Sequence, residues 1–143
     1  MSILGLTIDY GPYAFMEHFD PKYICNHSDH EGRYRYEAQP EICKWNLEML
    51  AQALNPVVPI AETTIYVENN YWTLYNEAYR SKMSEKLGLV DSDHDASKIE
   101  FTDEAKTVLE DLFKLMTICG SDFTNTFRDL SLLSKSADMT DED

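Results

Sequence analysis

The stretch PEICKWNLEMLAQAL, residues 40–54, decides the fold class of this chain. Its apolar side chains recur with the period of an α-helix, at Ile42, Trp45, Met49, Leu50 and Ala53. Proline is favoured in the first turn of a helix, as at Pro40, and the pair Asn55-Pro56 disfavours continuation beyond Leu54. The stretch therefore predicts an amphipathic helix, followed by an extended connector over residues 56–59.

Helical patterns continue toward the C-terminus. A second helix is predicted over residues 64–87, with Gly88 as its C′ residue. Its expected inner side chains are Val67, Tyr71, Leu74, Tyr75, Ala78 and Met83. Residues 91–100 predict a polar loop. A third helix should run from near Thr102 to Gly120, buried through Ala105, Val108, Leu109, Leu112, Phe113 and Met116.

A last helix is predicted from Asp122 or Thr124, with Phe123, Phe127, Leu130 and Leu133 on its apolar face. The acidic tail over residues 134–143 lacks an apolar period, which predicts disorder. At the other end, residues 2–8 form a short apolar run that predicts a buried strand. A turn at residues 9–12 should end this strand, and residues 13–39 predict an ordered loop. The expected fold is mainly α, with one short N-terminal strand.

Composition limits the function classes. The chain has 143 residues, 43% of them hydrophobic, which suits one folded domain. Lys and Arg number 12 against 26 Asp and Glu, for a net charge of −14. This charge would repel nucleic acid and anionic lipid, so neither is an expected partner. No run of 18 apolar residues is present, so no membrane-spanning segment is expected.

Two stretches resemble metal-binding motifs but lack the required spacing or residue types. Cys25, His27 and His30 lie close together in sequence, but no second ligand pair follows at zinc-finger spacing. The run Asp91–Asp95 begins like an EF-hand loop, whose sixth and twelfth positions should be Gly and Glu. Ala96 and Thr102 occupy those positions, which predicts a solvated loop.

Phosphate-binding and nucleophile motifs such as G-x-x-x-x-G-K-[ST] and G-x-S-x-G do not occur. The stripe Tyr71, Tyr75 and Tyr79 is most simply a packing face. One candidate site residue remains, because Asp9 directly follows the predicted strand and Gly11 follows two residues later. A protein kinase delivers a magnesium-binding Asp in this way. Turns after strands also favour Asp and Gly, so a plain turn residue stays open.

The segment from Ser2 to Leu54 resembles the selenoprotein O family. The motifs that carry the resemblance are IDYGP (8–12), ICNHSD (24–29), GRY (32–34), QPE (39–41) and WNL (45–47), with DFTNTFR (122–128) later in the chain. The resemblance covers most of the chain and is weakest over residues 60–100. Family members are kinase-like proteins that transfer AMP from ATP to protein hydroxyls. The implied fold is therefore the helical portion of a kinase-like C-lobe over residues 1–133.

The resemblance also implies cofactors, substrates and site residues. Magnesium would be the cofactor, ATP the substrate in a flipped orientation, and Ser, Thr or Tyr hydroxyls of proteins the acceptors. Asp9 is the position that would bind magnesium and contact ATP. In the family, a base Asp and a second metal-binding Asn come immediately before the methionine that is Met1 here. We therefore expect a piece of an adenylyltransferase without catalytic residues of its own, inactive alone.

Two further expectations follow. Missing neighbours should leave apolar surface exposed on the N-terminal strand and on the helix that carries Trp45. Residues 40–54 look closer to eukaryotic members, which implies a mitochondrial location, or otherwise a cytoplasmic one. The main alternative function is a non-catalytic helical interaction module or a truncated gene product.

Overall fold

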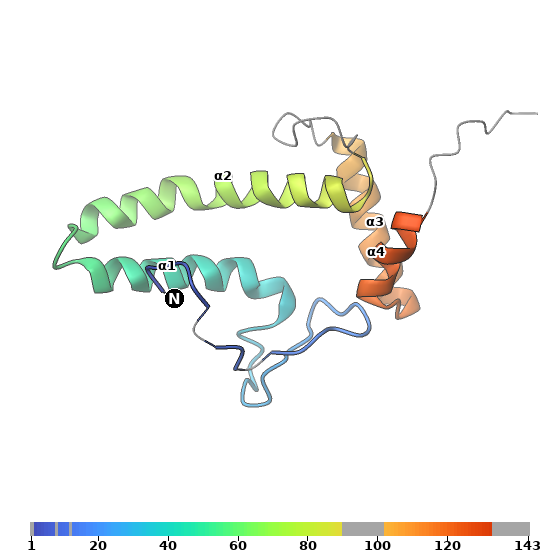
Figure 1. Cartoon of the computed structure of the whole chain (residues 1–143), viewed down its shortest axis with the longest axis horizontal. Coiled ribbons are helices and arrows are strands. Elements are labelled where there is room, and N and C mark those ends of the chain that lie inside the picture. Colours follow the sequence, from blue (N-terminus) through green and yellow to red (C-terminus); the bar gives the residue numbers. More distant parts are fainter. Residues whose placement is uncertain (1, 8, 12, 90–101, 133–143) are drawn as a thin grey trace, which may run out of the picture.

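A computed structural model describes residues 2–7, 9–11, 13–89 and 102–132, and this part of the chain is mainly helical. Its helices are α1 (Gln39–Leu54), α2 (Ile60–Lys86), α3 (Asp103–Cys119) and α4 (Phe123–Leu132). A 3-10 turn, η1 (Tyr36–Ala38), precedes α1. In Figure 1, α1 and α2 lie side by side and antiparallel, while α3 and α4 cross the C-terminal end of α2. None of these described helices combines the length and apolar character needed to cross a bilayer.

The turn between α1 and α2 explains why α2 begins earlier than predicted. Pro59, with φ of −53°, precedes the first helical residue, Ile60. The Asn55 side chain accepts a hydrogen bond from the Ile60 N–H at 3.0 Å, which satisfies one of the unpaired donors of the helix start. The Val57 N–H donates to the Leu54 carbonyl at 2.8 Å. The predicted connector is therefore a hydrogen-bonded turn, not an extended segment, and the predicted start at residue 64 was one turn late.

Polar and aromatic contacts join α1 to α2. Lys44 forms ion pairs with Glu48 at 2.7 Å and with Glu68 at 2.8 Å, and these carboxylates raise the pKa of the Lys44 ammonium. The Tyr71 hydroxyl donates to the Pro40 carbonyl at 2.6 Å. The predicted Tyr71–Tyr75–Tyr79 packing face is confirmed, since successive rings stack with centroids 6.1 Å and 5.9 Å apart. Burial raises the pKa of Tyr79 to about 12.

The predicted helix ends agree with the structure better than the predicted buried faces of the helices do. Thr102 caps α3 by accepting the Ala105 N–H at 3.2 Å, and Gly88 and Gly120 end α2 and α3 with positive φ. Several predicted inner residues are exposed, because each helix is covered by neighbours on only part of its surface. These exposed positions are Trp45, Ala53, Leu74, Ala78 and Val108. The predicted contact of Leu133 and the predicted tail at 134–143 lie outside the described residues, as does the loop at 91–100.

An aromatic cluster joins the loop before α1 to α3 and α4. Phe19 is 6% exposed, and its ring stacks on Phe113 and Phe123 with centroids 4.8 Å and 5.7 Å apart. The backbone is joined at the same place, because the Phe19 N–H donates to the Ser121 carbonyl at 2.9 Å and the Phe123 N–H donates to the Glu17 carbonyl at 3.1 Å. The short bridge between His18 and Asp122 thus connects segments that are distant in sequence.

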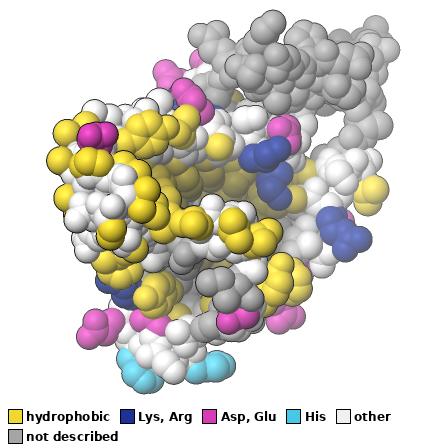
Figure 2. Space-filling view, turned by 60° about the vertical axis from the view of Figure 1, so that its left-hand side comes forward, with side chains coloured by type: hydrophobic (Ala, Val, Ile, Leu, Met, Phe, Trp, Pro, Cys, Tyr) yellow, Lys and Arg dark blue, Asp and Glu magenta, His cyan; other side chains and the backbone are white. Residues whose placement is uncertain are grey.

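The strand predicted over residues 2–8 is not present in the described residues. Residues 2–5 form a turn, in which the Gly5 N–H donates to the Ser2 carbonyl at 3.2 Å. A strand needs a partner for its backbone donors and acceptors, and the described residues supply none beside this segment. Its apolar side chains are exposed as expected: Ile3, Leu4 and Leu6 are 69%, 75% and 67% accessible. Figure 2 shows further apolar surface where the α1–α2 turn comes forward.

Candidate functional site

Asp9 lies in a tight turn on the exposed N-terminal segment. Its Oδ1 accepts a hydrogen bond from the Gly11 N–H at 2.9 Å, which is the local contact that makes Asp common in turns. A Cβ added at Gly11 would approach Asp9 Oδ1 to 3.1 Å, so a larger residue at this position would crowd the hydrogen-bonded carboxylate. Oδ2 has no hydrogen-bond partner among the described residues. The turn therefore holds Asp9 by one carboxylate oxygen.

The chemistry of this group fits magnesium as one ligand among several. Mg²⁺ takes hard oxygen ligands, and proteins often supply only one or two carboxylates while phosphates and water supply the rest. Within the described ranges, no three His, Cys, Asp or Glu side chains come together in a way that could hold a metal ion. This statement includes Cys25, His27 and His30, which are close in sequence. The run Asp91–Asp95 lies outside the described residues.

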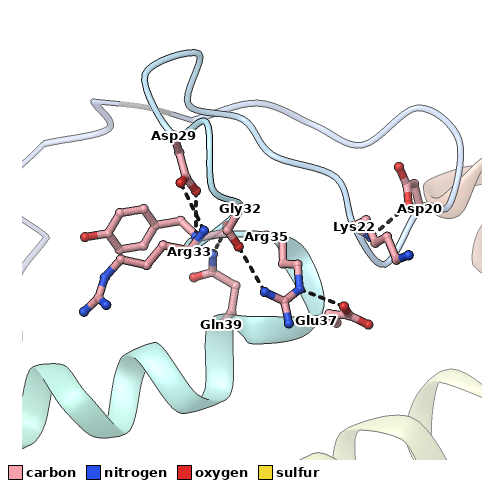
Figure 3. Close-up of polar contacts among 9 residues, drawn as sticks. Asp20, Lys22, Asp29, Gly32, Arg33, Arg35, Glu37 and Gln39 are labelled. Carbon is pink, nitrogen blue, oxygen red and sulfur yellow. Dashed lines mark hydrogen bonds and ion pairs between the residues drawn. The ribbon is translucent and has the colours of Figure 1, made fainter.

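The second polar centre is the loop that precedes α1, and Asp29 organises it (Figure 3). Its two carboxylate oxygens accept the backbone N–H groups of Arg33 at 3.0 Å and Tyr34 at 2.7 Å. The Tyr34 bond contributes most to lowering the pKa of Asp29, partial desolvation opposes it, and the Arg33 bond adds to it. Asp29 thus closes the loop over residues 29–34, and both of its carboxylate oxygens accept hydrogen bonds there.

Gly32 and Gln39 continue this network toward α1. Gly32 has φ of +71°, a conformation that glycine adopts at little cost. The Gly32 carbonyl accepts the backbone N–H and the guanidinium of Arg35, both at 3.2 Å, and Arg35 pairs with Glu37 at 2.7 Å. The Gln39 amide donates to the Tyr34 carbonyl at 2.6 Å. The motifs ICNHSD, GRY and QPE therefore form a single hydrogen-bonded unit (Figure 3).

Arg33 extends from this unit onto α1. Its guanidinium lies 4.6 Å from the centre of the Trp45 ring and 5.7 Å from that of Tyr34, which is cation–π geometry. Trp45 belongs to the WNL motif, so a fourth motif joins the same unit. Trp45 is 41% exposed, in line with the apolar surface expected on the helix that carries it.

Sequence reasoning identified Asp9 but missed Asp29 and the Arg33–Trp45 contact. The available signal was the spacing from Asp29 to Gly32, because an Asp followed by a glycine within a polar stretch indicates a turn closed by the carboxylate. The partner Trp45 was identified from its spacing as part of the apolar stripe of its helix, without a contact partner. No described interaction joins Asp9 directly to the Asp29 unit.

Comparison with known proteins identifies relatives over nearly the whole chain. The family model described as Protein adenylyltransferase SelO matches residues 1–143. The chain is 51% identical over 134 residues to Protein adenylyltransferase SelO-1, mitochondrial, of Danio rerio, covering 94% of this chain and 18% of that protein. It is 45% identical over 141 residues to Protein adenylyltransferase SelO, mitochondrial, of Mus musculus, covering 99% and 20%.

A bacterial relative matches equally well. Protein nucleotidyltransferase YdiU of Bordetella pertussis is 45% identical over 130 residues, which cover 91% of this chain and 25% of that protein. The chain therefore spans between about a fifth and a quarter of the length of these relatives.

Proposed function

Since this chain belongs to the protein adenylyltransferase SelO family, we propose that it forms part of an enzyme that transfers AMP from ATP to Ser, Thr or Tyr hydroxyls of proteins. The observation that carries the proposal is the family match over residues 1–143. The local structure supports it, because residues of four family motifs, ICNHSD, GRY, QPE and WNL, contact one another in one connected unit. The same membership supports a kinase-like C-lobe over residues 1–133, with the acidic tail at 134–143 outside it.

We assign Asp9 the role of magnesium ligand and ATP contact. Magnesium, when bound, neutralises charge between the phosphates of ATP. The contribution of Asp9 is a hard, anionic oxygen on an exposed turn, since Oδ2 has no hydrogen-bond partner among the described residues. Gly11 keeps that turn intact by donating its N–H to Oδ1. Tyr13 and Phe15, which follow this turn in sequence, lie beside Tyr34 of the Asp29 loop.

One carboxylate is not sufficient for AMP transfer. Transfer of a nucleotidyl group depends on several charged groups placed together around the phosphates. The described residues hold no cluster of three metal-binding side chains, and we assign no catalytic base in this chain. We therefore expect the 143 residues tested by themselves not to transfer AMP. We also propose a mitochondrial location, which the names of the Danio rerio and Mus musculus relatives support.

The test uses a chimaera in which residues 1–143 replace the matching segment of the Danio rerio relative. We expect transfer of labelled AMP from ATP with the parent segment. Asp9→Asn keeps an oxygen for the Gly11 N–H but removes the charge that attracts magnesium. Transfer should therefore fall to about 1% or less, in line with the loss of one group that stabilises transition-state charge.

Asp129→Asn is the matched control, because Asp129 is an exposed Asp on α4 and should leave transfer unchanged. Circular dichroism should give the same Tm for both variants. Substantial transfer by Asp9→Asn at ordinary magnesium concentrations would show that Asp9 only closes the turn. An inactive parent chimaera that is folded and binds ATP would contradict the proposed function of this segment.

A further inference from the structure

The motif DFTNTFR begins at Asp122, immediately before α4. The Asp122 carboxylate accepts two hydrogen bonds from Asn125, one from its backbone N–H at 2.7 Å and one from its side-chain amide at 3.0 Å. The Asp122 carbonyl accepts the Thr126 backbone N–H at 3.1 Å and the Thr126 hydroxyl at 2.6 Å. This is the pattern of an N-cap, which pairs donors that the first turn of a helix leaves free. Both carboxylate oxygens of Asp122 therefore hold the start of α4.

The connection between α3 and α4 is fixed from both helices. Gly120 ends α3 with φ of +63°, and the Ser121 N–H donates to the Met116 carbonyl at 3.0 Å. On the other side, the Asp122 cap fixes the first turn of α4, which begins at Phe123. The backbone groups of Ser121 and Phe123 are thus held in place on either side of Asp122.

These two backbone positions hold the segment that follows Asp9. The Ser121 carbonyl accepts the Phe19 N–H at 2.9 Å, and the Phe123 N–H donates to the Glu17 carbonyl at 3.1 Å, so the segment reaches α4 in Figure 1. Among the described residues, these are the first backbone hydrogen bonds after the Asp9 turn that join the segment to another part of the chain. Glu17 lies eight residues after Asp9, and eight residues extend over at most about 29 Å. The pairing therefore limits how far the Asp9 turn can move from the α3–α4 connection.

Loss of this pairing would lengthen the segment between Asp9 and its first backbone bond to the rest of the chain. The next such bond is at Pro21, whose carbonyl accepts the Glu37 N–H at 2.9 Å. The length would increase from eight residues to twelve. The probability that the end of a flexible segment is found at a given place falls with about the three-halves power of its length, which is roughly a twofold decrease for this change.

We propose that Asp122 is a positioning residue for AMP transfer. Asp122 caps α4, the capped connection holds residues 17–19, and residues 17–19 limit the positions that Asp9 can take. This inference rests on the proposed function, since it uses Asp9 as the magnesium ligand. Asp122 itself does not bind magnesium or ATP, because its carboxylate stays on Asn125.

The test measures transfer of labelled AMP by the chimaera across a magnesium titration at saturating ATP. Asp122→Ala removes the cap, so the magnesium concentration for half-maximal transfer should rise at least twofold, while the rate at saturating magnesium stays near that of the parent. Asp122→Asn should behave like the parent, because Asn is as good an N-cap as Asp. If Asp122→Asn were as impaired as Asp122→Ala, the charge of Asp122 would be what matters, and the proposal would be overturned.

Thr102→Ala is the matched control. Thr102 caps α3 by accepting the Ala105 N–H at 3.2 Å, and no described hydrogen bond joins the start of α3 to residues 9–19. Both alanine variants should lower the Tm by a few degrees through loss of a cap. Only Asp122→Ala should change the magnesium dependence. Equal changes in the two variants, or no change in either, would overturn the proposal.

Hydrogen exchange of the same chimaeras tests the anchoring without a need for activity. Asp122→Ala should speed exchange of the Phe19 and Phe123 amides, whereas Thr102→Ala should leave both unchanged. Unchanged protection in Asp122→Ala would overturn the proposal even if transfer were altered. If Asp122→Ala does not fold, Asp122→Gly gives a graded comparison, since Gly is a better N-cap than Ala.

The two measurements also separate this proposal from the proposed function. An active chimaera with faster amide exchange but an unchanged magnesium dependence would overturn the positioning role and leave the proposed function standing. A folded chimaera that is inactive even with the parent segment would contradict the proposed function and with it the positioning role, although faster exchange in Asp122→Ala would still establish that Asp122 holds residues 17–19.

Discussion

Asp9 and Asp29 both hold turns through backbone N–H groups, yet they use their oxygens differently. Asp29 accepts from two amides, at 3.0 Å and 2.7 Å, in a loop that contacts α1. Asp9 accepts from one amide at 2.9 Å, on a segment whose neighbouring side chains are largely exposed. Asp29 therefore closes its loop with both oxygens, whereas Asp9 closes its turn with one.

The same difference separates Phe15 from Phe19, four residues apart on one segment. Phe19 is buried among the rings of α3 and α4, whereas Phe15 is 80% exposed. The segment thus changes from an exposed strip to an anchored loop near Glu17, where backbone hydrogen bonds to the α3–α4 connection begin. Stability should therefore depend on the anchored part more than on the exposed part.

The largest expected effect compares these two phenylalanines. Phe19→Ala should cost about 3–5 kcal/mol of unfolding free energy, because it removes a buried ring and leaves a cavity between Phe113 and Phe123. Phe15→Ala should stay within about 0.5 kcal/mol of the parent, as exposed positions usually do. Urea denaturation followed by circular dichroism measures both.

If Phe19→Ala does not fold at all, Phe19→Leu provides the graded comparison, with a smaller loss of stability. Equal stabilities of the Phe15 and Phe19 alanine variants would show that the aromatic cluster does not hold the loop in solution.

The sequence predicted the helices well where local signals determine them. The Thr102 cap and the positive-φ glycines Gly88 and Gly120 mark ends that depend on neighbouring residues only. The strand at residues 2–8 failed for the opposite reason, because a strand is stable only beside a partner that local sequence does not identify. The loop before α1 was predicted as ordered but without detail, since Phe19 is fixed by rings distant in sequence.

The candidate site was predictable only in part. Asp9 follows from its place in the IDYGP motif, and its role as a magnesium ligand stays a prediction. Asp29 was missed although its spacing to Gly32 indicates a turn, because that spacing does not show which backbone N–H groups the carboxylate accepts. Trp45 fits a helical stripe equally well as core or as a surface platform, and only the position of Arg33 distinguishes them.

The second largest expected effect is the difference in Tm between variants of the two carboxylates, Asp29 and Asp9, at pH 7. Asp29→Asn should lower the Tm by several degrees, because Asn offers one acceptor oxygen where Asp29 uses two. Asp9→Asn should leave the Tm unchanged, since one oxygen suffices for the Gly11 N–H. Differential scanning calorimetry gives both values, and hydrogen exchange should show faster exchange of the Arg33 and Tyr34 amides in Asp29→Asn only.

The stabilising contribution of Asp29 should depend on pH in a defined direction. The pKa of Asp29 is lower in the folded chain than its ordinary value of 3.8. Its stabilising contribution is therefore fully present above about pH 4 and is lost as the pH falls through the folded pKa. The Tm difference between the parent and Asp29→Asn should shrink steadily below pH 4. A difference that stayed constant down to pH 2 would mean that the charge of Asp29 does not stabilise the loop.

The smallest effect concerns the contact that joins the Asp29 loop to α1. The Arg33 guanidinium lies 4.6 Å from the Trp45 ring centre, and exposed cation–π contacts contribute about 0.5–1 kcal/mol. Arg33→Gln should lose this amount, while Arg33→Lys should keep part of it because the charge remains. Trp45→Leu should make the two Arg33 variants equal, because the ring that distinguishes them is gone. The double-mutant cycle isolates this coupling from the backbone bond between Arg33 and Asp29, which all variants retain. A coupling energy near zero would show that the Arg33–Trp45 contact does not join the motifs GRY and WNL in solution.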